Sequence, residues 1–238
     1  MGINLDIAEK VVGTVYTFLG APGSGKGSLS EQCVAQLGWV QVSTGNLCRW
    51  HIAERTEIGL EIDFAIKSGK LVSDDLISSM VAEKLHRLAA AGEQNVILDG
   101  YPRTVPQAKN LYDMLENDGT RYLLRVVLFE IDRDEVVARL ASRLVCSNSA
   151  CQAVYSSRFE SGLRPKAAGS CDRCGAPLVP RKDDLADTIV ARIDAYEKHV
   201  APLLAFYAQV GQRVLRLDAA KAAPEVFAAF KKIVGLQD

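Results

Sequence analysis

Residues 18–30 read FLGAPGSGKGSLS, a glycine cluster between an apolar run and a helical pattern. Gly20, Gly25 and Lys26 fit the phosphate-binding pattern G-x-x-x-x-G-K, but another glycine precedes the expected hydroxyl, which comes at Ser28. Glycines allow backbone N–H groups to converge on one anion, the next helix offers its positive end, and the lysine adds a mobile charge. The alternative is a glycine-rich turn with an incidental lysine, but the flanking patterns favour a phosphate site.

Apolar runs of strand length alternate with helical patterns along the chain. The runs occupy residues 14–20, 39–43, 96–100, 122–131 and 213–218. Helices are predicted after the glycine loop and at 74–90, 105–117, 132–144, 183–210 and 224–234. This alternation predicts an α/β fold in which a parallel five-stranded sheet has helices on both faces. Ligands of such folds bind at the carboxyl ends of the strands, where the glycine loop, STGN (43–46) and DGYPRT (99–104) all fall.

The chain is long enough to bury a substantial core, and its positive and negative charges nearly cancel. The chain has 238 residues and a net charge of −1, which gives no global attraction to nucleic acid or membrane. No apolar run reaches the roughly 20 residues that span a bilayer. The N-terminus lacks the basic region of a signal peptide. We therefore expect a cytoplasmic protein.

The glycine loop and five later segments resemble motifs of the adenylate kinase family. GAPGSGKGS (20–28) is similar to the family's G-x-P-G-x-G-K-G-T, in which a glycine normally follows the lysine. The later segments keep the family's order: STGNLCR (43–49), GKLVSDDLI (69–77), LDGYPRTVPQA (98–108), RLASR (139–143) and RKDDLADTIVARI (181–193). The resemblance implies a P-loop nucleoside monophosphate kinase fold. Its parts would be a core (1–43, 74–143 and 187–238), an AMP-binding arm (44–73) and an inserted lid (144–186).

The same resemblance implies a set of site residues. ATP would be bound by Gly23, Ser24, Gly25, Lys26, Gly27, Ser28, Arg139 and Arg143, and AMP by Thr44, Arg49, Gly100, Arg103, Gln107, Arg181 and Arg192. The catalytic set would be Lys26, Asp99, Arg103, Arg143, Arg181 and Arg192, with Asp99 orienting waters around Mg²⁺ and Gln107 reading the adenine of AMP. Arginine suits this chemistry because its planar fork grips phosphate at two points. An isolated arginine more often caps a helix or forms a surface ion pair, but the matched motifs favour the site.

Three positions depart from the family's usual residues. Asn46 stands where the family has Asp, Ser73 where it has Pro, and Ser142 where it has Gly. The first change removes a charge near the expected site. None of the three removes an expected phosphate ligand.

Four of the six cysteines fall in an irregular segment, residues 146–180, that is rich in Gly, Pro and Ser. Cys146 and Cys151 are spaced C-x4-C, and Cys171 and Cys174 are spaced C-x2-C. Four thiolates can close a tetrahedral metal site and supply folding free energy to a segment too small for its own core. Disulfides would suit a secreted protein instead. Many bacterial members of the family carry a cysteine quartet in the lid, so the resemblance implies a structural Zn²⁺, with iron or cobalt as the alternative.

The expected activity is reversible, Mg²⁺-dependent transfer of a phosphoryl group from ATP to AMP, giving two ADP. We expect a monomer with no nucleic-acid or membrane partner. One alternative is a related kinase with another base preference, using GTP as donor or UMP or CMP as acceptor. A second is a weak phosphate-binding module, suggested by Asn46. A third is a zinc ribbon that binds nucleic acid, suggested by eight basic residues against two acidic ones at 139–182, where Tyr155 and Phe159 are the aromatic residues.

Overall fold

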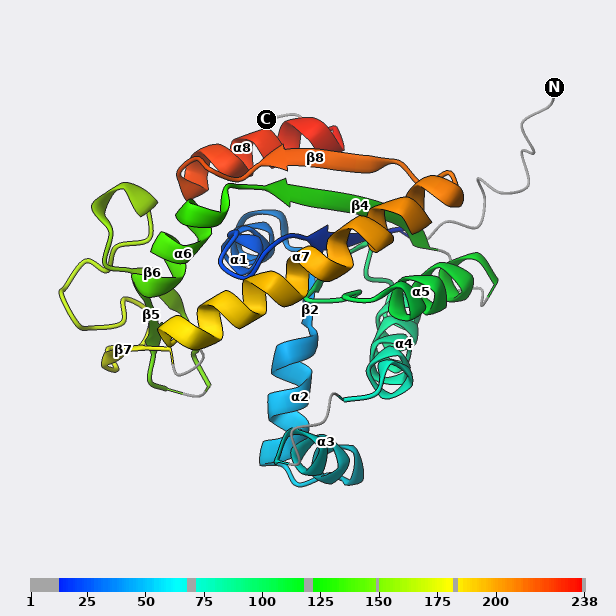
Figure 1. The fold of residues 1–238 in the computed structure, drawn as a ribbon, viewed down its shortest axis with the longest axis horizontal. Helices are drawn as coiled ribbons and strands as arrows, with labels where there is room; N and C mark the ends of the chain where they lie inside the picture. The colour runs from blue at the N-terminus through cyan, green and yellow to red at the C-terminus, as the bar shows by residue number, and fades with distance from the viewer. Residues whose placement is uncertain (1–12, 68–71, 118–121, 149, 182–183, 237–238) are drawn as a thin grey trace. The chain divides into compact units, whose positions relative to one another are not determined.

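The computed structural model describes residues 13–67, 72–117, 122–148, 150–181 and 184–236 (Figure 1). A parallel five-stranded sheet has the order β2-β3-β1-β4-β8. The strands are β1 (Gly13–Leu19), β2 (Val40–Ser43), β3 (Asn95–Asp99), β4 (Tyr122–Glu130) and β8 (Val214–Asp218). Helices alternate with these strands along the chain, so the predicted α/β class is confirmed. Residues 1–12, 69–71 and 182–183, which belong to the predicted core, arm and lid, lie outside the described residues.

The three strands that carry the expected motifs end at the same level. Ser43 of β2 and Phe18 of β1 both pair with Asp99 of β3. Val96 and Leu98 of β3 are fully buried, and so is Val15 of β1. Strands buried on both faces need continuous apolar runs, which is why these segments could be recognised from the sequence.

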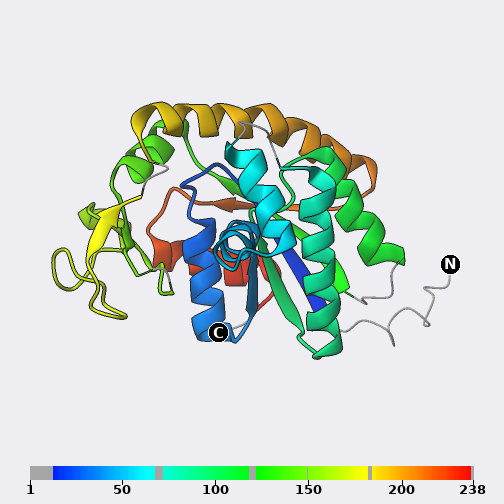
Figure 2. The same ribbon diagram turned by 90° about the horizontal axis from the view of Figure 1, so that it is seen from below.

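The chain divides into two compact units. The first contains the chain up to Leu19, Cys33–Val127 and His199–Leu215. In it α4 (Asp74–Ala90) and α5 (Val105–Asn117) lie side by side and cover β3 through buried residues such as Leu85 and Leu111 (Figure 2). The helices α2 (Thr44–Ala53) and α3 (Glu57–Lys67) pack together so closely that a Cβ at Gly59 would lie 1.9 Å from the His51 carbonyl oxygen.

The second unit contains Gly20–Gln32, Leu128–Lys198 and the chain from Arg216 onward. It holds the start of α1 (Lys26–Leu37), α6 (Arg133–Ala141), the first half of α7 (Ala186–Gln209) and α8 (Ala223–Val234). A small antiparallel sheet of order β6-β5-β7 also belongs to it (Figure 1). Its strands are β5 (Arg143–Cys146), β6 (Val154–Ser156) and β7 (Leu178–Pro180), and a 3-10 turn, η2 (Phe159–Ser161), follows β6.

The helix expected at 132–144 is shorter than predicted. It ends at Ala141 because Ser142 is its C-cap and Arg143 already pairs with Ser156 in the small sheet. The sheet itself was not predicted, since strands of three or four residues carry almost no periodic signal.

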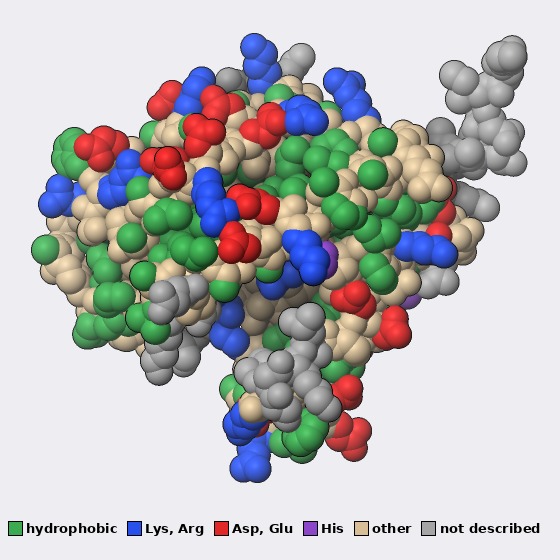
Figure 3. Space-filling view, in the orientation of Figure 1, with side chains coloured by type: hydrophobic (Ala, Val, Ile, Leu, Met, Phe, Trp, Pro, Cys, Tyr) green, Lys and Arg blue, Asp and Glu red, His purple; other side chains and the backbone are tan. Residues whose placement is uncertain are grey.

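Basic and acidic side chains are interspersed over the face seen in Figure 3, in keeping with the net charge of −1. Among the described residues, none of the helices combines the length and the apolar character that crossing a bilayer requires.

Candidate active site

The glycine loop joins β1 to α1, and Lys26 folds back over it. The Lys26 ammonium donates to the carbonyl oxygens of Gly20 and Ala21, each at 2.8 Å, and to Ser24 Oγ at 3.3 Å. The Leu29 amide donates to the Gly25 carbonyl at 2.9 Å and so begins the helix at the end of the loop. The loop therefore holds the ammonium against its own carbonyls, and α1 begins directly after it, so that a positive charge and a helix N-terminus belong to the same short segment.

Two positions in this loop favour glycine. Gly23 has φ +83°, and a Cβ there would lie 2.7 Å from Leu140 Cγ. At Gly20 a Cβ would lie 2.8 Å from Phe129 Cβ. The tight turn and its packing against α6 and β4 thus explain the glycines, independently of any ligand.

Arg143 and Arg192 share one buried carboxylate in the second unit. Arg143 donates to both oxygens of Asp184, at 2.6 and 2.7 Å, and Arg192 Nη1 donates to Asp184 Oδ1 at 2.9 Å. The Asp184 side chain is only 3% exposed. The pKa of Arg192 is lowered, first by burial and then by the positive charges of Arg143 and Arg181. The negative charge of Asp184 raises it and offsets part of this effect. Two predicted arginines therefore bind one acid, and the charge of a third, Arg181, acts on one of them.

Arg139 is held on α6. Its Nε donates to Glu135 Oε1 at 2.9 Å, and its Nη2 donates to the carbonyl oxygens of Ala220 and Lys221. Arg158 binds the same Glu135 oxygen at 2.9 Å. Burial raises the pKa of Glu135, but the bonds from Arg139 and Arg158 outweigh it and leave that pKa below its usual value. Gly25 lies next to Arg139, because a Cβ there would be 3.8 Å from its Nη1.

In the first unit, three predicted AMP-binding residues meet at the end of β3. The Gly100 carbonyl accepts from Thr44 Oγ1 at 3.0 Å and from Arg103 Nε at 2.8 Å. Gly100 has φ +80°, and a Cβ there would lie 2.9 Å from Arg103 Nη2. The glycine therefore allows the backbone to approach both side chains, and its carbonyl orients the Arg103 guanidinium.

Arg49 and Asp99 each have a neighbour that the sequence did not indicate. Arg49 donates through Nη2 to Asn46 Oδ1, so the residue that departs from the family pattern contacts a predicted phosphate ligand. Asp99 Oδ2 accepts from Gln41 Nε2 at 3.2 Å. Its carboxylate lies at the end of β3, and carboxylate oxygen is a ligand type that suits Mg²⁺.

Gln107 is buried in a network between the starts of α4 and α5. Its Oε1 accepts from the Arg103 amide at 2.8 Å, and its Nε2 donates to Asp74 Oδ1 at 2.7 Å. Thr104 Oγ1 donates to the second oxygen of Asp74, also at 2.7 Å. The network joins a predicted base-reading residue to the backbone of a predicted phosphate ligand.

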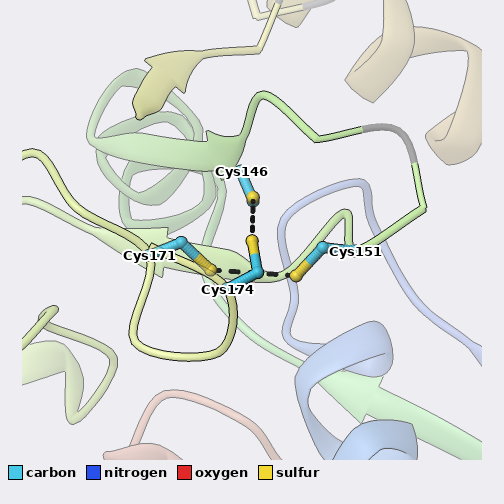
Figure 4. Close-up of side chains that lie close together, drawn as sticks. All are labelled: Cys146, Cys151, Cys171 and Cys174. Carbon is cyan, nitrogen blue, oxygen red and sulfur yellow. Dashed lines mark hydrogen bonds between the residues drawn. The ribbon is translucent and has the colours of Figure 1, made fainter. Parts of the chain in front are cut away.

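The four predicted metal-ligating cysteines lie together (Figure 4). Their sulfur atoms all lie within 4.8 Å of one another, with Cys146 and Cys174 3.4 Å apart and Cys151 and Cys171 3.7 Å apart. Four sulfurs around one zinc at the usual Zn–S distance would be about 3.8 Å apart. The donor set and its spacing therefore fit a closed tetrahedral site.

Tyr155 of β6 supports this cluster. The Asp172 amide donates to its oxygen at 2.8 Å, which leaves the hydroxyl hydrogen to donate to Cys171 Sγ at 3.5 Å. That bond is the largest of several that together lower the pKa of Cys171 to about 6 against the effect of burial, and so favour the thiolate, the form that binds metals.

Sequence reasoning missed three supporting residues: Asp184, Asp74 and Tyr155. The two acids lay inside matched motifs, and Tyr155 was noted only as a possible stacking aromatic. Their partners lie 41, 33 and 16 positions away, so only the fold reveals the contacts. Of the two remaining cysteines, Cys33 is fully buried and Cys48 is only partly buried.

Comparison with known proteins identifies the family. A family model described as "Adenylate kinase" matches residues 18–212. The adenylate kinase of Rhizorhabdus wittichii is 39% identical over 217 residues, covering 91% of this chain and 97% of the relative. That of Carboxydothermus hydrogenoformans is 37% identical over 213 residues, covering 90% and 95%. That of Bacillus pumilus is 37% identical over 217 residues, covering 91% and 96%. The chain belongs to the adenylate kinase family.

Proposed function

We propose that this protein is an enzyme that transfers a phosphoryl group reversibly between ATP and AMP, giving two ADP. One observation carries the proposal: the stretch that matches the adenylate kinase family, residues 18–212, includes Lys26 and the arginines that we expect to bind phosphate. Phosphoryl transfer demands little covalent chemistry from a protein, so catalysis consists of positioning the reactants and stabilising charge.

The triphosphate binds at the glycine loop. Backbone amides of residues 23–28, the Ser28 hydroxyl and Lys26 contact its phosphates, and Arg139 and Arg143 complete the site. Lys26 then exchanges the neutral carbonyls of Gly20 and Ala21 for charged phosphate oxygens, a stronger kind of hydrogen bond. Because the ammonium is already bound within the loop, the exchange needs only a side-chain movement.

Arg143, Arg181 and Arg192 act on the transferred group. Three guanidinium groups at one point repel one another, and Asp184 offsets this repulsion by binding Arg143 and Arg192 directly. The shared carboxylate also fixes their orientation before substrate arrives. Preorganised donors of this kind stabilise the charge of the transition state without a cost of reorganisation during the reaction.

The monophosphate binds in the first unit. Arg49 and Arg103 hold its phosphate, Thr44 and Gly100 line the pocket, and Gln107 reads the adenine. The Gly100 carbonyl orients Arg103 through Nε. A guanidinium fixed in this way can bind phosphate oxygens at two points, which a lysine cannot do.

Mg²⁺ bound to the ATP phosphates would neutralise part of their charge, and Asp99 would hold waters of that ion. In this proposal residues 44–73 form the AMP-binding arm, residues 144–186 form the lid, and residues 1–43, 74–143 and 187–238 form the core. Closure of arm and lid excludes water, which would otherwise compete with AMP as acceptor.

The lid holds a structural Zn²⁺ through Cys146, Cys151, Cys171 and Cys174. Four thiolates fill all the positions of a tetrahedral site, so the metal has a folding role and no chemical one. Reduced thiolates of this kind suit a cytoplasmic protein. The enzyme acts as a monomer, without nucleic-acid or membrane partners.

A coupled assay tests the function. The purified protein is given Mg²⁺ with ATP or GTP as donor and AMP, GMP, UMP or CMP as acceptor. We expect ATP with AMP to give the highest kcat/KM, and Lys26→Met to lose at least about 100-fold of it, the scale of a lost transition-state contact. A higher kcat/KM with GTP, UMP or CMP would instead indicate a kinase of another base preference. Binding without turnover would indicate a phosphate-binding module, and binding to RNA or DNA that a two-headed adenosine polyphosphate cannot displace would indicate the zinc-ribbon alternative.

A further inference from the structure

Two neighbours hold the Gln107 side-chain amide: one can only accept a hydrogen bond, and the other can only donate one. Asp74 Oδ1 can only accept, and it receives Nε2 at 2.7 Å. The Arg103 amide can only donate, and it reaches Oε1 at 2.8 Å. Turning the amide by half a rotation would place two donors together at one end and two acceptors together at the other. The Gln107 side chain, in a residue only 6% exposed, therefore has one orientation.

Asp74 is itself fixed by its neighbours. It is the first residue of α4, where Ser73 caps the helix by accepting from the Leu76 amide at 3.2 Å. Its second oxygen accepts from Thr104 Oγ1 at 2.7 Å. Because α4 and α5 lie side by side (Figure 2), the carboxylate meets Gln107 in the first turn of α5.

The amide keeps one N–H and one oxygen lone pair for a ligand. Adenine offers a donor at its 6-amino group and an acceptor at N1, so a fixed amide can pair with both atoms. A 6-oxopurine such as hypoxanthine offers the opposite order, an acceptor at position 6 and a donor at N1. Pairing with that base in the same position would need the amide turned around, which the contacts with Asp74 and Arg103 oppose.

We propose that Asp74 is a positioning residue that sets base choice: by fixing the Gln107 amide, it favours adenine over 6-oxopurines in the monophosphate pocket. The inference rests on the proposed function, in which Gln107 reads the base. It assigns to an acidic residue at the start of α4 a role in specificity without contact with the nucleotide.

The test is Asp74→Asn, measured with AMP and IMP as alternative acceptors. Asparagine has the shape of aspartate but can offer Gln107 either an acceptor or a donor, so one of the two constraints disappears. IMP reverses the hydrogen-bonding order of AMP without adding an amino group. We expect the ratio of kcat/KM for AMP to that for IMP to fall at least about tenfold, which corresponds to about 1.4 kcal/mol.

Asp75→Asn is the matched control. Asp75 is exposed in the same first turn of α4 and loses the same charge, so the AMP-to-IMP ratio should stay at its original value. A purely structural role for Asp74 would lower kcat/KM for both acceptors equally and leave the ratio unchanged, and that result would overturn the inference. An equal change of the ratio in Asp75→Asn would overturn it too.

Two further observations separate the possible failures. If Asp74→Asn does not fold, Thr104→Val carries the test, because it releases one anchor of the carboxylate and should lower the ratio in the same direction; an unchanged ratio there would contradict the inference. If the unaltered protein transfers no phosphoryl group to AMP, the proposed function fails. If the unaltered protein does phosphorylate AMP, the change in the ratio of kcat/KM for AMP to that for IMP decides the role of Asp74.

Discussion

Arg143 and Asp184 lie 41 positions apart in the sequence and form a two-point ion pair, with Nε to Oδ2 at 2.6 Å and Nη2 to Oδ1 at 2.7 Å. The carboxylate is 3% exposed and also binds Arg192. Removing one member of a buried pair leaves an uncompensated charge, at a cost of about 3–5 kcal/mol. Asp184 therefore supports both the stability of the second unit and the geometry of its arginines.

Asp184→Asn tests that role. It keeps the shape but removes the charge that holds two arginines together, so we expect a lower thermal midpoint and a fall in kcat of at least about tenfold, because oriented donors stabilise the transition state. Melting curves and steady-state kinetics measure the two effects. Asp194→Asn is the control, since that residue is 57% exposed and its solvent-screened pair with Arg133 should contribute little to stability. Equal effects of the two substitutions would contradict the role of Asp184.

Changing Arg103 to Lys tests the acceptor site. Lysine keeps the charge but loses the fork and the bond from Nε to the Gly100 carbonyl. We expect kcat/KM for AMP to fall at least about 100-fold, with little change in the melting curve. Arg87→Lys, at an exposed residue of α4 that pairs with Glu83, should have normal kinetics. Unchanged kcat/KM in Arg103→Lys would show that Arg103 does not bind the phosphate of AMP.

Gly23→Ala and Gly38→Ala form a matched pair in backbone conformation. Both glycines have positive φ, +83° and +68°, so alanine costs about 1–2 kcal/mol of backbone strain at either position. Only at Gly23 would the new Cβ also meet a side chain, Leu140 Cγ at 2.7 Å, whereas nothing lies within 4 Å at Gly38. Gly23→Ala should therefore lower the thermal midpoint further and weaken ATP binding, measured by calorimetry. Equal ATP affinity in the two variants would show that the loop conformation does not matter for the triphosphate.

Cys171→Ser tests the lid metal. A neutral hydroxyl is a poor zinc ligand, so the variant should lose its metal and its melting curve should no longer respond to a chelator. Elemental analysis should find about one metal per chain in the unaltered protein and in Cys48→Ser, which lies outside the cluster. Well under one metal in the unaltered protein, together with a melting curve that chelator does not change, would refute the four-cysteine site.

The main strands and the cysteine cluster could be predicted from the sequence, whereas the contacts that support the site residues could not. The strand expected at 122–131 is observed as Tyr122–Glu130, because its buried second half, residues 126–129, is a continuous apolar run that the sequence shows directly. The cysteine pairs were recognisable from their spacing, and the structure brings their sulfurs together. The small sheet was missed because its strands are too short to show a period. The contacts of Asp184 and Asp74 were missed because they join segments 41 and 33 positions apart, which no local pattern can indicate.

The most direct test of the central claim follows the γ-phosphoryl group itself. ATP labelled in its γ-phosphate is mixed with unlabelled AMP, Mg²⁺ and the purified protein, and the products are separated. The account predicts labelled ADP formed from AMP, with the label in its β-phosphate and little in inorganic phosphate, because the acceptor site holds AMP and excludes water. Label released only as inorganic phosphate, or retained in ATP, would contradict it.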